Sequence, residues 1–218
     1  HADHDAGVLR RIMNGQRVKL ITTRLIFESW LRKADAILND PDMPEAERID
    51  VRKYVEFEEA VRGQTREIDG IKFTFDYSFH SVPTMRFIAE VEGRKITYFS
   101  DTFYNPPELE RLRDAGVISR ERYDHLMTWG WDSDLVIHEA GMPPIHSPLA
   151  VLNKLPAEVK GRTLVVHTGA IPAEIKDKEG NVLEKIEGLR LAEEGQTISL
   201  ISYKESVLRL FELLANNP

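Results

Sequence analysis

The residues best suited to chemistry in this sequence are its histidines and the carboxylates beside them. The chain has seven histidines and no cysteine. Without thiols there are no disulfides, thiolate metal sites or cysteine nucleophiles, so His, Asp and Glu must carry any metal chemistry. All but one of the histidines lie at the ends of expected strands or in loops. Catalytic side chains are commonly held at such positions by a rigid scaffold.

The first group of candidate ligands is residues 1–7, which read His-Ala-Asp-His-Asp-Ala-Gly. Imidazoles and carboxylates this close together, just before an expected helix, can present several borderline ligands to one or two divalent cations. The alternative interpretation of this heptapeptide, taken alone, is an exposed polar terminus or a segment added to the protein.

Further candidate ligands recur where apolar strands are expected to stop. His80 follows an alternating strand, Asp101 follows residues 96–100, and His167 follows residues 163–166. Each of them, taken singly, would more often be a satisfied core or loop residue. Their recurrence in one short chain favours a shared metal site.

These segments resemble the motifs of one family. Residues 1–7 look like the His-x-His-x-Asp-His signature of the metallo-β-lactamase superfamily, entered at its second histidine. Residues 79–87 resemble the segment that carries the next metal histidine in ribonuclease Z relatives. Residues 98–102 resemble their Tyr-Ser-Gly-Asp-Thr segment, with the glycine absent, and residues 166–168 would supply the last metal histidine.

Two more segments complete the resemblance. Residues 135–140 are similar to the His-Glu-Ala segment of the ribonuclease Z group, and His146-Ser147 stands where that group has His-Ser-Thr. The resemblance therefore spans essentially the whole chain. It rests on the ordered set of motifs and is closest to the ribonuclease Z and cyclic-nucleotide phosphodiesterase branch.

The resemblance implies two divalent metal ions, zinc in the first place, with manganese and iron as alternatives. One ion would be held by His1, His80 and a histidine two positions before His1. The second ion would be held by Asp3, His4 and His167, and Asp101 would lie between the two ions. The metal ligands that the resemblance implies in this chain are His1, Asp3, His4, His80, Asp101 and His167.

The same resemblance implies catalytic roles. Two ions of this kind hold a bridging water whose pKa is low enough to give hydroxide near neutral pH, which suits phosphodiester hydrolysis. His146 is then the candidate general acid for the leaving alkoxide, and Glu139 would orient His146 or raise its pKa. Asp3 is a further candidate, as an acceptor of a proton from the water.

The sequence departs from the family pattern at its beginning. The first histidine of the signature and several strands of the family's first sheet would precede His1. We therefore expect that an upstream segment or a second chain completes the sandwich. Alone, the chain would expose a sheet face and an edge. A homodimer is expected by resemblance.

The elements that must position these residues alternate between strands and helices. One globular domain over residues 1–218 is expected from the length and from a hydrophobic content of 42%. The class is mixed α/β, and the resemblance implies the four-layer αβ/βα sandwich with its first strands absent. Helices are expected at 6–14, 24–39, from about 44, at 107–115, 119–129, from about 147, and at 203–215; strands at 18–23, 72–79, 85–91, 95–99, 134–138, 163–167 and 197–201.

Several residues have a structural interpretation that competes with a functional one. His138 ends a strand and is more often packed than catalytic, and His125 lies on an expected helix as a surface or core residue. Trp129 and Trp131 could stack on a base but are more often core residues. The acidic run 56–59 is expected to be a solvated helix face.

The net charge limits the partners. A charge of −7 and a pI near 5.6 argue against broad nucleic-acid binding, which depends on Lys and Arg neutralising phosphates. No apolar run of membrane length is present, and the lack of cysteine fits a cytoplasmic setting.

The first functional hypothesis is a metal-dependent phosphodiesterase for a small phosphodiester such as a cyclic nucleotide. The short spacing between His80 and Asp101 leaves no room for the long tRNA-gripping arm of bacterial ribonuclease Z relatives, so tRNA 3′-end processing comes second. Hydrolysis of a lactone, thioester or β-lactam is a third candidate. From another class, the chain would be a non-catalytic sensor or scaffold.

Overall fold

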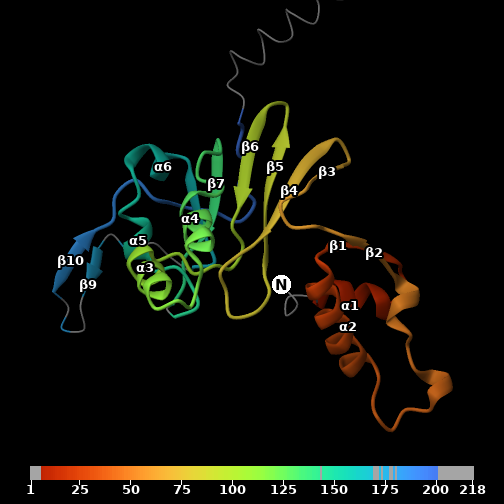
Figure 1. The fold of residues 1–218 in the computed structure, drawn as a ribbon. Coiled ribbons are helices and arrows are strands. Elements are labelled where there is room, and N and C mark those ends of the chain that lie inside the picture. Colours follow the sequence, from red (N-terminus) through yellow and green to blue (C-terminus); the bar gives the residue numbers. More distant parts are fainter. Residues whose placement is uncertain are drawn as a thin grey trace, which may run out of the picture.

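The computed structural model describes residues 6–142, 144–168, 172, 174–176, 179 and 181–200. Three of the expected metal ligands, His1, Asp3 and His4, and the expected helix 203–215 lie outside these residues. Figure 1 shows two parts, a large sheet with helices beside it and an N-terminal part set apart from that sheet. Among the described residues, no helix combines the length and the apolar character needed to cross a membrane.

The large sheet has seven strands in the order β11-β8-β7-β6-β5-β4-β3. Strands β3 to β6 pair antiparallel, whereas β6, β7, β8 and β11 run parallel. The strands are β3 (Thr65–Ile68), β4 (Ile71–Tyr77), β5 (Met85–Val91), β6 (Arg94–Tyr98), β7 (Leu135–Glu139), β8 (Thr163–Val166) and β11 (Arg190–Leu191). A small antiparallel pair, β9 (Glu174–Lys176) and β10 (Val182–Lys185), lies outside this sheet.

Tight turns set the register of the antiparallel half. Glu92 and Gly93 join β5 to β6 with φ angles of 51° and 73°. Two consecutive residues with positive φ match the twist of flanking strands, which makes such turns common in hairpins. The strands expected at 85–91 and 95–99 are therefore joined by a tight hairpin, and Arg94 already belongs to β6.

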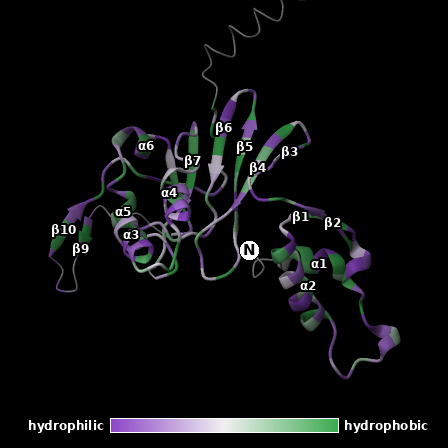
Figure 2. Cartoon of the chain, in the orientation of Figure 1, coloured by the Kyte–Doolittle hydropathy of each residue, from purple (hydrophilic) through white to green (hydrophobic). Residues whose placement is uncertain are grey.

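Helices occupy the connections between the parallel strands, as a parallel sheet requires. Between β6 and β7 lie α3 (Pro106–Asp114) and α4 (Arg120–Thr128), and between β7 and β8 lie α5 (Leu149–Leu152) and α6 (Ala157–Gly161). The residues that join these helices to the sheet form one apolar cluster: Phe103, Tyr104, Leu109, Leu126, Ala140, Leu152 and Val165. Figure 2 shows how hydrophobic and hydrophilic residues alternate along the same elements.

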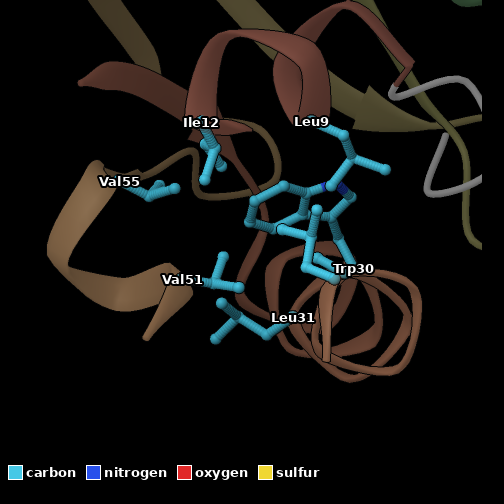
Figure 3. Close-up of a cluster of buried hydrophobic side chains, with 8 residues drawn as sticks. Leu9, Ile12, Trp30, Leu31, Val51 and Val55 are labelled. Carbon is cyan, nitrogen blue, oxygen red and sulfur yellow. The ribbon is translucent and has the colours of Figure 1, made fainter. Parts of the chain in front are cut away.

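The N-terminal part has its own core. It contains α1 (Ala6–Met13), β1 (Val18–Thr22), α2 (Arg24–Leu38) and β2 (Val55–Glu59), with β1 and β2 paired in parallel. Trp30 lies at the centre of the buried side chains drawn in Figure 3. The other members of this cluster are Leu9, Ile12, Leu31, Ala34, Leu38, Val51 and Val55. The single domain over residues 1–218 stays a prediction.

Most expected elements are present, and the mixed α/β class is confirmed. The helix expected from about residue 44 is wrong: that region holds only two 3-10 turns, η1 (Glu45–Glu47) and η2 (Val51–Tyr54). The acidic run 56–59 is also not a helix face but part of β2. The physical reason is that Phe57 stacks on Phe27 of α2, with ring centroids 4.0 Å apart, while the strand pairs with β1.

Two more expectations differ in extent. The helix expected from about residue 147 is divided into α5 and α6, because Pro148 and Pro156 precede separate short helices. Residues 197–200 of the strand expected at 197–201 form no strand.

Candidate functional site

Three candidate residues gather at the carboxyl ends of adjacent parallel strands. Asp101 follows β6, His146 lies in the loop after β7, and His167 directly follows β8. Their ligand atoms all lie within 4.8 Å of one another. In open α/β sheets the carboxyl ends of parallel strands commonly form the ligand site. The strand-end placement expected from the sequence therefore brings these side chains together.

His80 joins this group from the antiparallel half of the sheet. It lies in the loop between β4 and β5, and its ring centroid is 5.2 Å from that of His146. Its Nδ1 is 3.0 Å from the backbone oxygen of Ile145. A carbonyl oxygen only accepts, so Nδ1 is the donor in this contact. This is the arrangement that commonly orients a metal-ligating histidine.

Asp101 and His167, two of the expected metal ligands, are in direct contact. Asp101 Oδ1 is 3.2 Å from His167 Nδ1, and the His167 side chain is 46% exposed. The rings of His146 and His167 lie 4.9 Å apart at 81°. Their nitrogens thus border the same space from two directions. Asp101 borders the same space from the end of β6.

The backbone is strained at this site. Ser100 has a φ of 55° and His167 a φ of 59°, which is the left-handed region that favours glycine. Ser100 stands where the family segment has its glycine. Left-handed conformations in other residues cost free energy and concentrate at functional sites, where the surrounding structure holds them in place. The two strained positions, Ser100 next to Asp101 and His167 itself, flank the contact between Asp101 and His167.

Gly141 allows His146 to approach the chain after β7. A Cβ atom built on Gly141 would lie 2.8 Å from both Cβ and Cγ of His146, which is too close for a real side chain. The Gly141 N–H also donates to the backbone oxygen of Ser147, at 3.2 Å. Any larger residue at position 141 would displace the imidazole.

Glu139 connects the loops that carry Asp101 and His146. It is 1% exposed, and its Oε1 accepts from the backbone N–H groups of Ser147 and Thr102, at 2.9 and 3.2 Å. The Ser147 hydroxyl donates to the backbone oxygen of Thr102, at 2.7 Å. The second oxygen, Oε2, lies 3.3 Å from Nδ1 of His146. Glu139 and Ser147 therefore fix the separation of the two loops.

Burial dominates the electrostatics of this pair. It raises the pKa of Glu139 to about 7, against the opposing effect of the two backbone hydrogen bonds. Burial also lowers the pKa of His146, and the nearby charge of His167 acts in the same direction. The pKa of His146 is therefore lowered, whereas Glu139 was expected to orient His146 or to raise its pKa. The orienting role of Glu139 stays a prediction, and the 3.3 Å approach agrees with it.

A cavity opens at the same place. Its volume is about 400 Å³, within the range of small-molecule sites. His146 and His167 are on its wall, so a molecule in the cavity would contact both imidazoles. The remaining lining residues are Ala140, Gly141, Met142, Leu149 and Thr168.

The donor set fits a divalent metal ion. Imidazoles and carboxylates are the ligands that zinc, manganese and iron share. Glu139 Oε2 and His146 Nδ1 are buried polar atoms without a hydrogen-bond partner. Such atoms are costly unless a further group satisfies them. Of the expected site residues, His80, Asp101, Glu139, His146 and His167 come together here.

The role of His146 has a second possibility that the sequence did not indicate. The resemblance implied that it is a general acid, whereas in the structure one of its ring nitrogens lies within 4.8 Å of the ligand atoms of Asp101 and His167. His146 could therefore be a third metal ligand. Ser147 was also missed as a functional residue. The sequence signal was its place in the His-Ser segment, but only the structure shows which groups it bonds.

His138 is a core residue. It is fully buried, its Nδ1 donates to the backbone oxygen of Glu139 at 2.7 Å, and its ring stacks on Trp131. Burial lowers the pKa of His138 to about 4, so its ring is neutral at pH 7. Trp131 packs against Phe99, and Trp129 lies under a buried guanidinium, as expected for core aromatics.

Two proteins of Dictyostelium discoideum are similar to this chain in sequence, although no model of a known protein family matches it. The chain is 38% identical over 193 residues to cAMP/cGMP-dependent 3',5'-cAMP/cGMP phosphodiesterase B, and the aligned residues make up 88% of the chain and 17% of that protein. It is 32% identical over 217 residues to cGMP-dependent 3',5'-cGMP phosphodiesterase A, and the aligned residues make up 98% of the chain and 23% of that protein. The chain thus spans less than a quarter of the length of these curated relatives.

A solved structure is similar as well. The metallo-β-lactamase fold protein YhfI from Bacillus subtilis matches with 12% identity and a TM-score of 0.45, covering 78% of this chain and 63% of its own. The sequence similarity to the two Dictyostelium phosphodiesterases agrees with the predicted resemblance to the cyclic-nucleotide phosphodiesterase branch.

Proposed function

We propose that this chain is the hydrolytic part of a metal-dependent phosphodiesterase that cleaves a small phosphodiester, such as a cyclic nucleotide. One observation carries the proposal: Asp101, His146 and His167 present ligand atoms within 4.8 Å of one another, on a cavity of about 400 Å³. The names of the two Dictyostelium relatives support the substrate class. The net charge of −7 favours a small substrate over a long nucleic acid.

The metal-binding residues follow from the site and from the resemblance together. His80, Asp101 and His167 would hold two divalent ions, and His1, Asp3 and His4 would contribute further ligands. Bound ions of this type activate a water molecule and stabilise negative charge on a phosphate. Zinc is the first candidate, and Asp3 is a candidate proton acceptor.

His146 and Glu139 would handle the leaving group. A phosphodiester in the cavity would contact His146, which would protonate the departing oxygen. The Glu139 carboxylate, 3.3 Å from Nδ1, would keep the imidazole turned toward the substrate. A homodimer and a cytoplasmic location stay predictions.

The experiment is to measure metal content and turnover together. The purified protein is analysed for bound transition metals and assayed with cAMP, cGMP and bis-p-nitrophenyl phosphate. We expect bound metal and metal-dependent hydrolysis, and we expect Asp101→Ala to lose both. Asp132→Ala is the control, because Asp132 is 73% exposed and, among the described residues, pairs only with Lys95, at 3.6 Å.

The outcomes separate the candidate functions. Bound metal with hydrolysis of tRNA precursors but not of cyclic nucleotides would replace this proposal with the endonuclease alternative. Bound metal without hydrolysis of any phosphodiester would favour a sensor or scaffold. Equal activity of Asp101→Ala and the unaltered protein would remove Asp101 from the site.

A further inference from the structure

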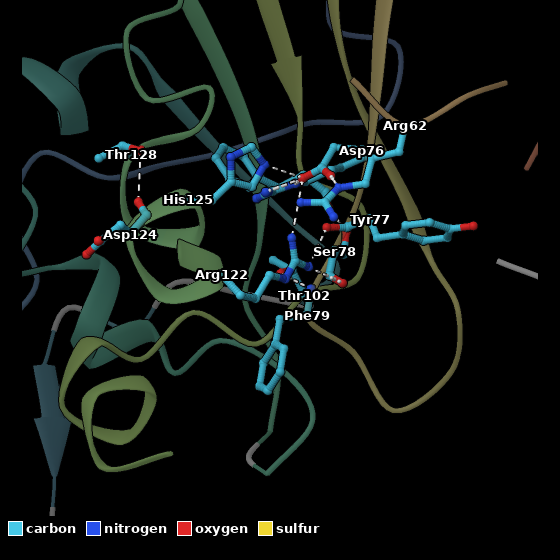
Figure 4. Close-up of polar contacts among 12 residues, drawn as sticks. Arg62, Asp76, Tyr77, Ser78, Phe79, Thr102, Arg122, Asp124, His125 and Thr128 are labelled. Carbon is cyan, nitrogen blue, oxygen red and sulfur yellow. Dashed lines mark hydrogen bonds and ion pairs between the residues drawn. The ribbon is translucent and has the colours of Figure 1, made fainter. Parts of the chain in front are cut away.

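The segment that carries His80 is held by a helix on which no site residue lies. Arg122 of α4 donates from Nη2 to the backbone oxygens of Tyr77 and Ser78, at 2.9 and 3.3 Å. These two residues end β4 and begin the loop that contains His80. Figure 4 shows the guanidinium of Arg122 between its helix and this turn of the chain. Arg122 therefore contacts the chain two residues before a candidate metal ligand.

A buried carboxylate holds Arg122 in this position. Asp76 on β4 is 2% exposed, and its Oδ2 lies 3.6 Å from Nη1 of Arg122. The same carboxylate accepts from Arg86 at 2.5 and 2.9 Å, from Arg62 at 2.8 Å and from His125 at 2.9 Å. The arginine is drawn toward Asp76 by its charge while its Nη2 bonds the adjacent backbone. The network therefore joins α4 to the end of β4.

The same turn is bonded to the loop that carries Asp101. The Ser78 hydroxyl donates to the backbone oxygen of Phe99, at 2.6 Å. The N–H of Phe103 donates to the backbone oxygen of Phe79, at 2.6 Å, and the N–H of Phe79 donates to the hydroxyl of Thr102, at 3.4 Å. A displacement of residues 77–79 would therefore reach both candidate ligands, His80 and Asp101.

We propose that Arg122 is a positioning residue of the metal site, which transmits the fixed geometry of the Asp76 network to the segments that carry His80 and Asp101. This inference rests on the proposed function, because it concerns the same site. Partners beyond the ligands orient them, and their loss typically lowers metal affinity about 10-fold to 100-fold. Arg122 bonds the backbone oxygens of Tyr77 and Ser78 and no side chain of a candidate ligand among the described residues, so it acts through the backbone.

The network contains a matched control. Arg62 also donates to Asp76, at 2.8 Å, but it reaches the carboxylate from the connection between β2 and β3. Within the described part of the chain it makes no hydrogen bond to the turn at residues 77–79. A purely structural role for Arg122 predicts that Arg122→Met and Arg62→Met act alike. A positioning role predicts that only Arg122→Met changes the metal site of the folded protein.

The experiment measures Zn²⁺ affinity by competition with a chromophoric chelator, on the purified protein and on both variants, under conditions in which each is folded by circular dichroism. We expect Zn²⁺ affinity to fall about 10-fold or more in Arg122→Met and to stay unchanged in Arg62→Met. Arg122→Lys keeps the charge and one donor, and we expect it to recover part of the affinity. If Arg122→Met does not fold, Arg122→Lys and Arg62→Lys replace the pair, and only the former should weaken binding.

A second readout needs no metal. The ring resonances of His80, assigned by comparison with His80→Gln, are recorded by NMR in the metal-free protein and should shift in Arg122→Met but not in Arg62→Met. Unchanged Zn²⁺ affinity and unchanged His80 resonances in Arg122→Met, or equal changes in Arg62→Met, would overturn the proposal. If the unaltered protein binds no Zn²⁺, the proposed function fails, while the His80 resonances still decide the role of Arg122.

Discussion

Two buried carboxylates in this molecule have opposite properties. Asp76 and Glu139 are 2% and 1% exposed, so both lose nearly all contact with water. The pKa of Asp76 is lowered to about 2, because Arg86 and His125 outweigh the effect of its burial. The pKa of Glu139 is raised to about 7, because burial outweighs its two backbone hydrogen bonds. The partners, and not the depth of burial, decide which carboxylate is permanently charged.

The difference separates a structural centre from a chemical one. Both carboxylate oxygens of Asp76 accept hydrogen bonds from side chains, Oδ1 from Arg62 and Oδ2 from Arg86 and His125. Glu139 keeps Oε2 without a hydrogen-bond partner, beside an imidazole nitrogen in the same condition. Incomplete satisfaction of buried polar groups is costly in a core and is typical of a site that completes itself with a ligand. Substitutions at the two positions should therefore affect different measurements.

The largest effect on stability is expected from Asp76→Ala. Arg86 is 1% exposed and would lose its counterion. Removing one partner of a buried ion pair costs about 3–5 kcal/mol, because the remaining charge is left in a poor solvent. Urea unfolding followed by circular dichroism measures the loss, with Asp132→Ala as an exposed control. A loss below about 1 kcal/mol would show that Arg86 is not isolated by the substitution.

The next effect concerns activity and comes from Glu139→Gln. The amide keeps an oxygen for the N–H groups of Ser147 and Thr102 but removes the charge beside His146. We expect kcat to fall about 10-fold to 100-fold with little change in the free energy of unfolding. Asp76→Asn should show the reverse at saturating metal, with a large loss of stability and a smaller change in kcat per folded molecule. Similar profiles for the two variants would remove the distinction between the two carboxylates.

An acid titration tests the charge of Asp76. Its pKa is about 2 in the folded protein against the usual 3.8, so its carboxylate contributes stability above about pH 3.8 that is lost as the pH falls toward 2. One pKa unit corresponds to about 1.4 kcal/mol, which gives about 2 kcal/mol in this window. Urea unfolding between pH 5 and pH 2 measures the slope, and Asp76→Asn should make it shallower. An equal slope in the variant would place the acid sensitivity elsewhere.

The sequence predicted the chemical centre better than the structural one. His80, Asp101 and His167 were identified because a polar ligand type at the end of an apolar strand is a local signal. Asp76 lies inside an alternating strand, on the side opposite Phe75 and Tyr77, where a polar residue normally faces water. It is buried because α4, far along the chain, places Arg122 and His125 against that face.

The same limit explains the error at residues 56–59. Two or three acidic residues in succession indicate a solvated surface, but not whether the backbone is helical or extended. Pairing with β1 and stacking of Phe57 on Phe27 decide for a strand, and both partners are more than 25 residues away along the chain. Contacts between distant segments thus override a local pattern.

The smallest effect is expected from Ser100→Gly, which tests whether the chemical centre stores strain. Among the described non-glycine residues with positive φ, Asp69 and Glu92 lie in hairpin turns, whereas Ser100 and His167 lie at the site. Glycine would relieve the left-handed backbone at position 100, and we expect stability to rise by about 0.5–1 kcal/mol. Ser81→Gly, at an exposed position without positive φ, should instead lower stability.

If Ser100→Gly is less stable than the unaltered protein, the Ser100 hydroxyl contributes more to stability than the backbone strain costs, and the site is not strained at this point. If Ser100→Gly is more stable and binds Zn²⁺ more weakly, the strained backbone at Ser100 lowers stability but directs Asp101 toward His167.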